Sequence, residues 1–255
     1  MTVGIRKPGD FCWINMLTPK PAEALGFYGA LLGWAFGEIP GMGYSIKVGG
    51  KNIGGLFDLE GPNTPPGTTP DIGVMVKVAS ADDAAARVNA LGGRAQPSFD
   101  IMDQGRMAVC FDPNGANLDV WEARKGQGME ADSADHGAPS WFETLTTDTA
   151  RATEFYTALF GWTAEPKALA GTTYTVFSLG DTPIAGLMAI PPEMGPAPPH
   201  WGTYFTVRDV DAAVREAEKL GGTVCVPVRP VEGIGRFAGL ISPQGVMFYV
   251  IEYAR

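Results

Sequence analysis

The chain contains two similar halves. A strand-like segment at 13–18 leads into an apolar, helix-like run that carries Phe27-Tyr28 and then Gly33-Trp34. The same order of features returns 128 residues later, where Trp13, Phe27 and Gly33 are matched by Trp141, Phe155 and Gly161. A spacing that is kept through several pairs of motifs indicates a duplicated domain.

The length of the chain agrees with that duplication. At 255 residues it exceeds the usual size of a single domain, so two domains of about 120 residues each are expected. We predict one domain at residues 1–123 and a second at 139–255. The residues between them, 124–138, are polar and contain glycine, which is typical of a linker.

Each half repeats a shorter pattern. Apolar periodicity predicts helices at 21–32, 82–91, 150–160 and 210–220. Short apolar runs between glycine and proline turns predict strands at 10–17, 36–39, 43–48, 52–59, 72–78, 95–101, 106–111, 117–122, 140–146, 173–179, 184–190 and 202–207, with further strands ending at Glu252. The order is that of four βαβββ units, two in each domain.

These units predict an α+β fold with two mostly antiparallel sheets. Each pair of units would form one curled sheet with helices on one face. The other, concave face is called a cup here, and it is the expected position of a ligand.

Charge and composition limit the kinds of partner. A net charge of −9 and a pI near 4.7 argue against nucleic acid and anionic membranes, because phosphate groups need a basic surface. No apolar run approaches the ~20 residues of a membrane span, and the first ten residues lack the apolar core of a secretory signal. The three cysteines are scattered, which fits a reducing compartment. We therefore expect a cytoplasmic protein that binds a small molecule, either as a monomer with paired domains or as a homodimer.

The motifs resemble those of the vicinal oxygen chelate superfamily, which comprises glyoxalases, bleomycin-resistance proteins and extradiol dioxygenases. The resemblance rests on the Phe-Tyr and Gly-Trp pairs, on the Leu-Gly-Gly endings at 91–93 and 220–222, and on the X-Pro-X-Gly turns at 112–115 and 242–245. It covers about the whole chain outside the linker. The chain is similar, in particular, to tandem two-domain glyoxalase-like proteins of actinobacteria, some of which occur in antibiotic pathways. The resemblance implies the fold but not the activity, because this superfamily hosts many chemistries.

The resemblance also implies where a metal would be held. Metal enzymes of this superfamily bind a divalent ion with His and Glu side chains, and the ion holds two adjacent substrate oxygens. The matching positions in this sequence are Trp13, Gly55, Gly73 and Asp119 in the first domain, and Trp141, Gly186, Gly202 and Tyr249 in the second. Indole and glycine supply no ligand, and one carboxylate is too few for a tight site. We therefore expect no metal and no other cofactor.

Other polar residues lie near these positions. Glu122 and Glu252 stand three residues after Asp119 and Tyr249, the positions that match metal ligands. Strand alternation therefore directs them to the opposite face of the sheet, where a solvated or helix-facing role is favoured. His200 stands two residues before Gly202, which is the position that matches a metal ligand. Because the chain has only one other histidine, a loop or hydrogen-bonding role is favoured over a metal role for His200. Arg106 and Arg236 begin matched strands, and either face is open to them.

The predicted inward faces of the strands are rich in aromatic residues. The first cup would be lined by Trp13, Asn15, Met75, Asp119 and Trp121, and the second by Trp141, Glu143, Tyr204, Tyr249 and Ile251. Tyr44 and Tyr174 form a further matched pair on third strands. Such walls favour a planar or aromatic ligand, although the same aromatics could fill the cups as core. The second cup is the better candidate because it combines a carboxylate with tyrosines.

Glu143 is the residue with a predicted chemical role. A carboxyl group in an aromatic-lined cup has a raised pKa and can serve as a general base. The alternative is a structural hydrogen bond to a neighbouring strand or loop, since a buried polar group needs a partner in either case.

Two functions of different classes follow. The first is a metal-independent enzyme for proton-transfer chemistry such as isomerisation or cyclisation of an aromatic or polyketide-like molecule, with Glu143 as acid/base and Tyr249 as hydrogen-bond donor. The second is a binding protein that sequesters or carries such a molecule unchanged, as bleomycin-resistance relatives do. A metal-dependent glyoxalase or dioxygenase is disfavoured by the missing ligands.

Overall fold

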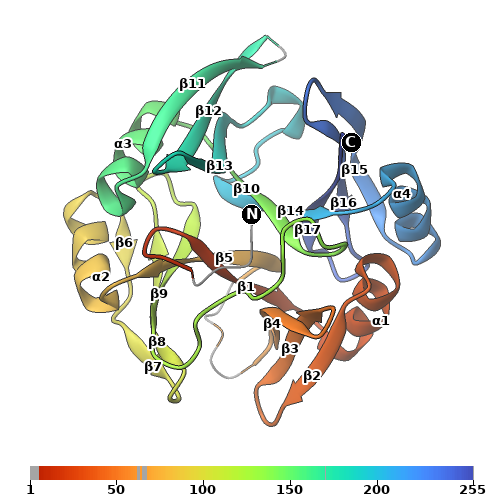
Figure 1. The fold of residues 1–255 in the computed structure, drawn as a ribbon, viewed down its shortest axis with the longest axis horizontal. Coiled ribbons are helices and arrows are strands. Elements are labelled where there is room, and N and C mark those ends of the chain that lie inside the picture. Colours follow the sequence, from red (N-terminus) through yellow and green to blue (C-terminus); the bar gives the residue numbers. More distant parts are fainter. Residues whose placement is uncertain (1–5, 62–63, 65–67, 170, 255) are drawn as a thin grey trace.

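Two curled sheets with helices packed at their sides make up the structure (Figure 1). The computed structural model describes residues 6–61, 64, 68–169 and 171–254. Along the chain, a strand, a helix and then further strands follow one another four times, and two such units form each sheet. The predicted α+β fold with paired βαβββ units is therefore confirmed.

The first sheet is formed by the strands between Phe11 and Ala123. Its spatial order is β2-β3-β4-β1-β5-β9-β8-β6, and β7 pairs with β8. The pairs β1–β4 and β5–β9 are parallel, and the others are antiparallel. The bounds are β1 Phe11–Thr18, β2 Ala35–Ile39, β3 Gly43–Val48, β4 Lys51–Asp58, β5 Asp71–Val78, β6 Arg94–Ala95, β7 Phe99–Ile101, β8 Gly105–Phe111 and β9 Asn117–Ala123.

The second sheet repeats this arrangement between Pro139 and Tyr253. Its spatial order is β11-β12-β13-β10-β14-β17-β16-β15, in which β10–β13 and β14–β17 are the parallel pairs. The bounds are β10 Pro139–Thr146, β11 Thr163–Leu169, β12 Thr172–Leu179, β13 Thr182–Ala189, β14 His200–Thr206, β15 Thr223–Val231, β16 Gly235–Ile241 and β17 Met247–Tyr253.

The helices begin and end at recognisable signals. Ser80, Asp148 and Asp209 each accept a backbone N–H of the first turn of the following helix, which satisfies a donor that the helix leaves unpaired. The first and third helices end at Gly33 and Gly161, whose φ angles of 67° and 71° suit glycine. The helices are α1 Pro21–Leu32, α2 Ala81–Ala90, α3 Thr149–Phe160 and α4 Val210–Lys219, with a short 3₁₀ helix, η1, at Pro192–Met194.

Two strand predictions differ from the structure. The segment 95–101, predicted as one strand, is two short strands, β6 and β7, on either side of Pro97, which has no N–H for a sheet bond. Strand β11 was not predicted, because its Thr163–Leu169 segment contains Pro166 and two charged residues. It lies at the edge of the sheet, pairs only with β12, and is mostly exposed, so it needs no apolar pattern.

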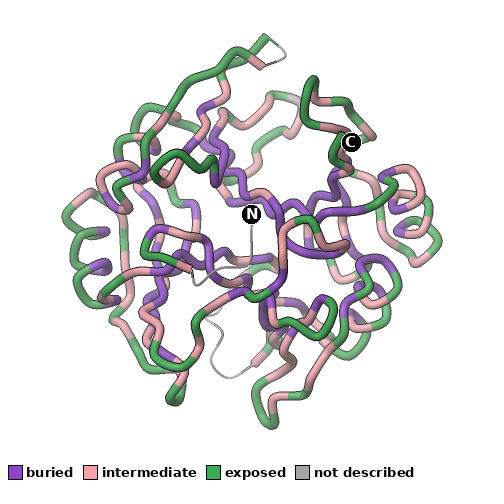
Figure 2. Tube along the Cα trace, viewed as in Figure 1, coloured by how far each residue is buried: buried purple, intermediate pink, exposed green. Residues whose placement is uncertain are grey.

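The two sheets share one hydrophobic core. Phe11 of β1 stacks on Phe142 of β10 with ring centroids 4.1 Å apart, and Trp34 packs edge-on to Phe205 at 5.2 Å. Buried residues from all four long helices and both sheets belong to the same cluster. Figure 2 shows the buried segments along the middle of the molecule, and exposed residues on the hairpins at its rim.

Buried polar bonds tie the halves together across this core. The Tyr156 hydroxyl of α3 donates to Asp112 Oδ2 in the β8–β9 turn at 2.9 Å, and Trp201 Nε1 donates to the same hydroxyl at 2.9 Å. The indoles of Trp34 and Trp162 donate to backbone oxygens of Gly137 and Gly9. The halves are thus joined by specific hydrogen bonds as well as by apolar packing.

The segment at 124–138 is packed rather than loose. Met129 and Ala131 are buried in the shared core, and the Met129 N–H donates to Cys12 O at 2.7 Å. None of the helices in the described part of the chain has the length and apolar character to cross a membrane.

Candidate functional site in the second cup

The residues on the concave faces form two clusters apart from the shared core. Cys12, Met75, Met107 and Trp121 gather in the first cup, with Trp13 packed against them. In the second cup, Tyr204, Tyr249 and Ile251 gather, with partly buried residues against them, namely Trp141, Val226, Phe237 and Met247. The alternation of β1, β5, β9, β10, β14 and β17 places the predicted lining residues on the side away from the core.

Glu143 lies at the floor of the second cup. In the sheet it is paired with Gly186 of β13 on one side and Gly202 of β14 on the other. Only 7% of Glu143 is exposed, and its Oε1 accepts a hydrogen bond of 2.9 Å from the Tyr204 hydroxyl. The carboxyl group therefore stands between two residues without side chains, under a cover of aromatic rings.

Tyrosine side chains occupy the space that the two glycines leave. A methyl group at position 186 would overlap the Tyr174 hydroxyl, and one at 202 would come within 2.6 Å of the Tyr249 ring. The Tyr249 ring also stacks on that of Tyr204, with centroids 4.4 Å apart and planes 11° from parallel. Glycine is needed at both positions because these rings lie directly against the sheet.

A row of polar groups leads from Trp141 to Glu143. Trp141 Nε1 donates to the Tyr174 hydroxyl at 2.8 Å, and this hydroxyl lies on the side of Glu143, where it lowers the pKa of the carboxyl group against the larger effect of burial. The Tyr249 hydroxyl takes part in neither this row nor the bond from Tyr204, so it is the phenol that is free to meet a ligand.

Burial sets the protonation behaviour of this cluster. It raises the pKa of Glu143 above its usual value, while the hydrogen bonds from Tyr174 and Tyr204 act in the opposite direction. Burial, followed by the nearby Glu143 carboxylate, raises the pKa of Tyr249, so this phenol keeps its proton. The direction of the Glu143 pKa agrees with the prediction from the sequence. Glu143 also makes the structural contact named as the alternative, the hydrogen bond from Tyr204 on the neighbouring strand β14.

The first cup has the same plan with different groups. Asn15 pairs with Gly55 and Gly73 where Glu143 pairs with Gly186 and Gly202. Asp119 stands at the position of Tyr249, is 6% exposed and accepts from Asn117 Nδ2 at 3.3 Å. Burial raises the pKa of Asp119 to about 7.

The pairing of Tyr44 with Tyr174 is wrong. Tyr44 pairs with Leu56 of β4 and packs against the shared core, whereas Tyr174 pairs with Met188 and faces the second cup. Ser45 pairs with Gly55 in the first sheet as Val176 pairs with Gly186 in the second. Two residues before each of these lie Gly43 and Tyr174, so Gly43 is the residue that matches Tyr174. A shift of one residue along a strand reverses the face, and the sequence repeat does not specify that register.

The two strand-end glutamates lie on the outer face, as predicted. Glu122 Oε2 accepts from the Ala81 N–H at the start of α2, and Glu252 Oε2 accepts from the Val210 N–H at the start of α4. A carboxylate at these helix N-termini satisfies an unpaired donor and matches the helix dipole.

The two arginines belong to the same outer face. Arg236 forms ion pairs with Glu252 and Asp211, and Arg106 pairs with Asp82 and Asp100. Neither arginine therefore reaches the cups.

His200 is part of β14 and has a hydrogen-bonding role. Its Nδ1 lies 2.8 Å from the backbone oxygen of Pro198. His200 also lies near Asp71, the residue that matches it in the first half, and its charge lowers the pKa of Asp71 against the larger effect of burial.

Sequence reasoning missed some residues of the cups. Phe237 and Met247 line the second cup, and the buried Lys77 of the first sheet donates from Nζ to Gln127 Oε1 at 2.9 Å. Phe237 follows Arg236, whose direction the sequence alone left open; in the structure Arg236 pairs with the outer-face residue Glu252, so its neighbour Phe237 faces the cup.

The lining residues do not fit a divalent ion. Within the described ranges, no group of three or more His, Cys, Asp and Glu side chains lies close enough to hold one. In the second cup the projected positions carry an indole, two glycines covered by tyrosines, and a phenol. These groups are not the nitrogen and carboxylate donors that such ions prefer, so no step is assigned to a metal.

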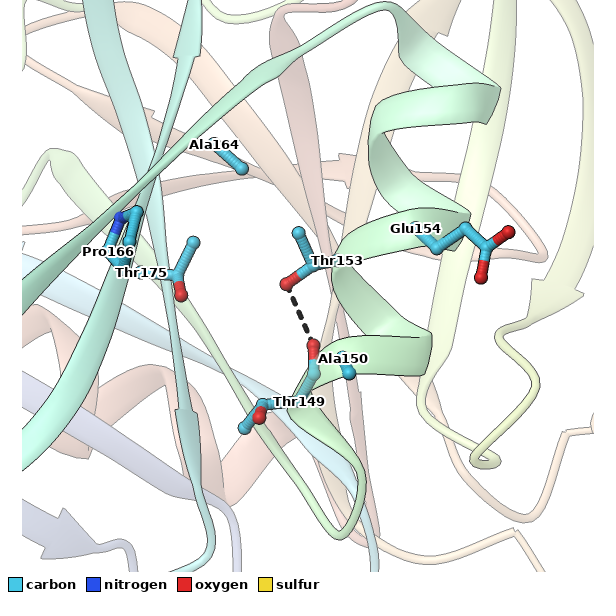
Figure 3. Close-up of a pocket in the computed structure, with 7 residues that line it drawn as sticks. All are labelled: Thr149, Ala150, Thr153, Glu154, Ala164, Pro166 and Thr175. Carbon is cyan, nitrogen blue, oxygen red and sulfur yellow. Dashed lines mark hydrogen bonds between the residues drawn. The ribbon is translucent and has the colours of Figure 1, made fainter.

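A cavity of about 450 Å³ lies outside both cups, against α3. Figure 3 shows Thr153, Ala164, Pro166 and Thr175 around it, while the Glu154 carboxylate points away from β12. The Thr153 hydroxyl is already bonded to Thr149 O at 2.7 Å. Its charged lining residue, Glu154, points away from the other lining side chains, so the second cup remains the candidate site.

Comparison with known proteins identifies the class to which this fold and these cups belong. Residues 139–248 match the family model described as the Glyoxalase/Bleomycin resistance protein/Dioxygenase superfamily. Over 249 residues the chain is 33% identical to "Putative glyoxylase CFP32" of Mycobacterium tuberculosis, which covers 95% of this chain and 94% of that protein. The chain belongs to this superfamily.

A second group of relatives carries a pathway in its name. The chain is 33% identical over 261 residues to "Anthracycline biosynthesis protein DnrV" of Streptomyces peucetius, covering 96% of this chain and 94% of that protein. The similarity to both kinds of relative spans the two halves.

Solved structures with low sequence identity share the fold. The 2,3-dioxygenase LapB from Pseudomonas sp. KL28 superimposes with a TM-score of 0.67 at 14% identity, over 99% of this chain and 94% of that one. The Mn(II)-bound glyoxalase from Novosphingobium aromaticivorans gives a TM-score of 0.65 at 15% identity, over 96% and 82%. At such identities the likeness speaks for the architecture alone.

Proposed function

We propose that the protein catalyses proton transfer, without a metal, on a small planar molecule bound in the second cup. The observation that carries the proposal is Glu143, a buried carboxyl group with a raised pKa that lies among phenols and an indole. Perturbed titratable groups in concave, aromatic-lined sites are candidates for acid/base chemistry. As part of the same proposal, the protein acts in the cytoplasm.

The reaction follows from the groups present. The Glu143 carboxylate takes a proton from a carbon next to a carbonyl group, and the Tyr249 hydroxyl donates a hydrogen bond to the enolate oxygen that forms. Glu143 then returns the proton to a different carbon, which is an isomerisation. Where the enolate carbon attacks a second carbonyl of the same molecule, a carbon–carbon bond forms, the oxygen of that carbonyl takes the proton held by Glu143, and the result is a cyclisation.

Aromatic and apolar side chains support the proposed class of ligand. Trp141, Tyr204 and Ile251 offer flat and apolar surfaces of the kind that bind aromatic or polyketide-like molecules. The names of DnrV and DauV, which place those relatives in anthracycline biosynthesis, agree with such a ligand.

A binding protein without turnover is the second candidate. It is favoured by the close packing of Tyr174 and Tyr249 over the glycines, which resembles a filled core. Native mass spectrometry of the purified protein would identify any molecule retained in the cup. Incubation of that molecule with wild type and with Glu143→Gln then separates the two functions. Conversion by wild type alone supports the enzyme, and binding without conversion by either protein supports the carrier.

A further inference from the structure

Tyr174 differs from the other phenols of the second cup in position. Tyr204 and Tyr249 lie on the central strands β14 and β17, are 6% and 3% exposed, and stack on each other. Tyr174 lies on β12, next to the edge strand β11, and is only half-buried. Of the three rings, it is the one that can move with the least loss of packing.

The Tyr174 hydroxyl occupies space beside Glu143. It lies where a side chain of Gly186 would be, and Gly186 is the sheet partner of Glu143. In the first sheet the residue that matches Tyr174 is Gly43, and the Phe57 ring lies where a side chain of Gly55 would be, so an apolar ring takes the place of this hydroxyl in the first cup. A ligand that reaches the 7% exposed Glu143 needs room, and the place of this hydroxyl lies directly beside the carboxyl group.

The hydrogen bonds around Tyr174 have a fixed direction. An indole N–H can only donate, so the Tyr174 oxygen accepts from Trp141 and its own proton is left for Glu143. Glu143 therefore faces two phenol protons: Tyr204 donates to it at 2.9 Å, and the proton of the Tyr174 hydroxyl is directed to its side.

We propose that Tyr174 is a positioning residue that a ligand displaces: it holds Glu143 in place and occupies part of the ligand's space, and it swings out when the ligand enters. This inference rests on the proposed function of Glu143. When the Tyr174 hydroxyl leaves, the Glu143 carboxylate loses one phenol donor. The C–H group of the ligand does not replace it, because a C–H group donates a much weaker hydrogen bond than a phenol. Hydrogen bonds to a carboxylate favour its charged form, so losing one strengthens Glu143 as a base at the moment of ligand entry.

The first test concerns the bond to Glu143 and needs no ligand. The titration of Glu143 is followed by the infrared carbonyl band of the protonated acid, assigned with Glu143→Gln. Tyr174→Phe removes the hydroxyl and keeps the ring, and Gly186→Ala pushes the hydroxyl away. We expect the titration midpoint to rise by about one pH unit in both variants.

Tyr253→Phe is the matched control for this titration. Tyr253 is a phenol of the same sheet, 38% exposed, that donates to Ser140 Oγ at 3.0 Å and not to Glu143. It should leave the midpoint unchanged. If Gly186→Ala does not fold, Trp141→Phe, which frees the Tyr174 hydroxyl to rotate, takes its place. An unchanged midpoint in Tyr174→Phe would overturn the positioning role.

The second test concerns displacement. The dissociation constant of 1,8-dihydroxyanthraquinone, a planar phenol-ketone, is measured by calorimetry for wild type, Tyr174→Ala and Tyr253→Ala. Because a ligand no longer has to move a side chain, we expect Tyr174→Ala to bind about tenfold more tightly and Tyr253→Ala to bind as wild type does. Weaker binding or no binding by Tyr174→Ala contradicts displacement and makes Tyr174 a ligand contact. Failure of the proposed function appears separately, as unchanged conversion in Glu143→Gln.

Discussion

Glu143 and Asp119 are buried carboxyl groups on the floors of matched cups, but their partners differ. The Glu143 carboxyl group lies among phenols and accepts a hydrogen bond from Tyr204, whereas Asp119 lies among amides and accepts one from Asn117. For both carboxyl groups, burial raises the pKa by more than the hydrogen bonds lower it. Each group is therefore held at a cost in stability, which is expected for residues that serve a site rather than the fold.

Asp119→Asn should change how stability depends on pH. The pKa of Asp119 is about 7 in the folded chain against 3.8 for an ordinary Asp, so between these values the unfolded chain loses the proton and the folded chain keeps it. Stability conferred by the neutral group is thus lost as pH rises from about 4 to 7. The Asn variant should be more stable than wild type at pH 8, by up to about 4 kcal/mol, and equal to it near pH 4.

Urea unfolding at several pH values measures this difference. Asp181→Asn, at an exposed turn, is the control and should leave the pH dependence as it is. An Asp119→Asn variant with the wild-type pH profile would show that Asp119 ionises normally in the folded chain.

At the scale of elements, local signals account for what the sequence predicts well. The bounds of α1 match the prediction and those of the other helices agree within one residue, because apolar spacing, caps and terminal glycines coincide. Strand β11 is missed because an edge strand needs no apolar residues. Tyr44 is predicted to face the cup but faces the core, because its direction depends on the register with its partner strand β4. The inward residues Trp141, Glu143, Tyr204 and Tyr249 follow from alternation, but the closure of Tyr174 over Gly186 depends on the register of the β12–β13 hairpin, which shifts between Phe177 and Ser178.

The caps of the helices can be tested by substitution. Asp148 accepts the Arg151 N–H at 3.0 Å, so Asp148→Ala should lower the free energy of unfolding by about 1 kcal/mol. Lys20, before α1, makes no side-chain cap, so Lys20→Ala should not lose this contribution. Equal losses in the two variants, by chemical denaturation, would contradict the assigned role of the Asp148 side chain.

At the scale of the molecule, the two sheets place their cups apart and bury their other faces in one core. The stacked pair Phe11–Phe142 and the Trp34–Phe205 contact cross between the halves. Neither half covers its own apolar face, so the halves should fold as one cooperative unit.

Expression of residues 139–255 alone tests this dependence. The fragment exposes Phe142, Phe205 and Trp201, which the first half contacts in the whole chain. We expect it to lack a cooperative thermal transition, whereas the whole chain shows a single one. A dispersed NMR spectrum with a sharp melting transition for the fragment would contradict a shared core.

The polar contact at the centre of the interface should be worth more than its counterpart. Tyr156→Phe removes the partner of the buried Asp112 carboxylate and should cost about 2 kcal/mol of stability. Tyr28, the matching tyrosine of α1, is equally buried but faces the neutral Ser242, so Tyr28→Phe should cost less. Thermal unfolding of both variants measures the difference, and a larger loss in Tyr28→Phe would contradict this ranking.

The central claim, that Glu143 moves protons in the second cup, has a direct measurement. It is the rate at which the protein exchanges deuterium from solvent into 2-tetralone, an enolisable aromatic ketone, followed by NMR. The account predicts that wild type accelerates the exchange over buffer, that Glu143→Gln loses at least about 100-fold of this acceleration, and that Asp119→Asn in the first cup keeps it within about twofold. Exchange that survives in Glu143→Gln, or is lost in Asp119→Asn, would contradict it.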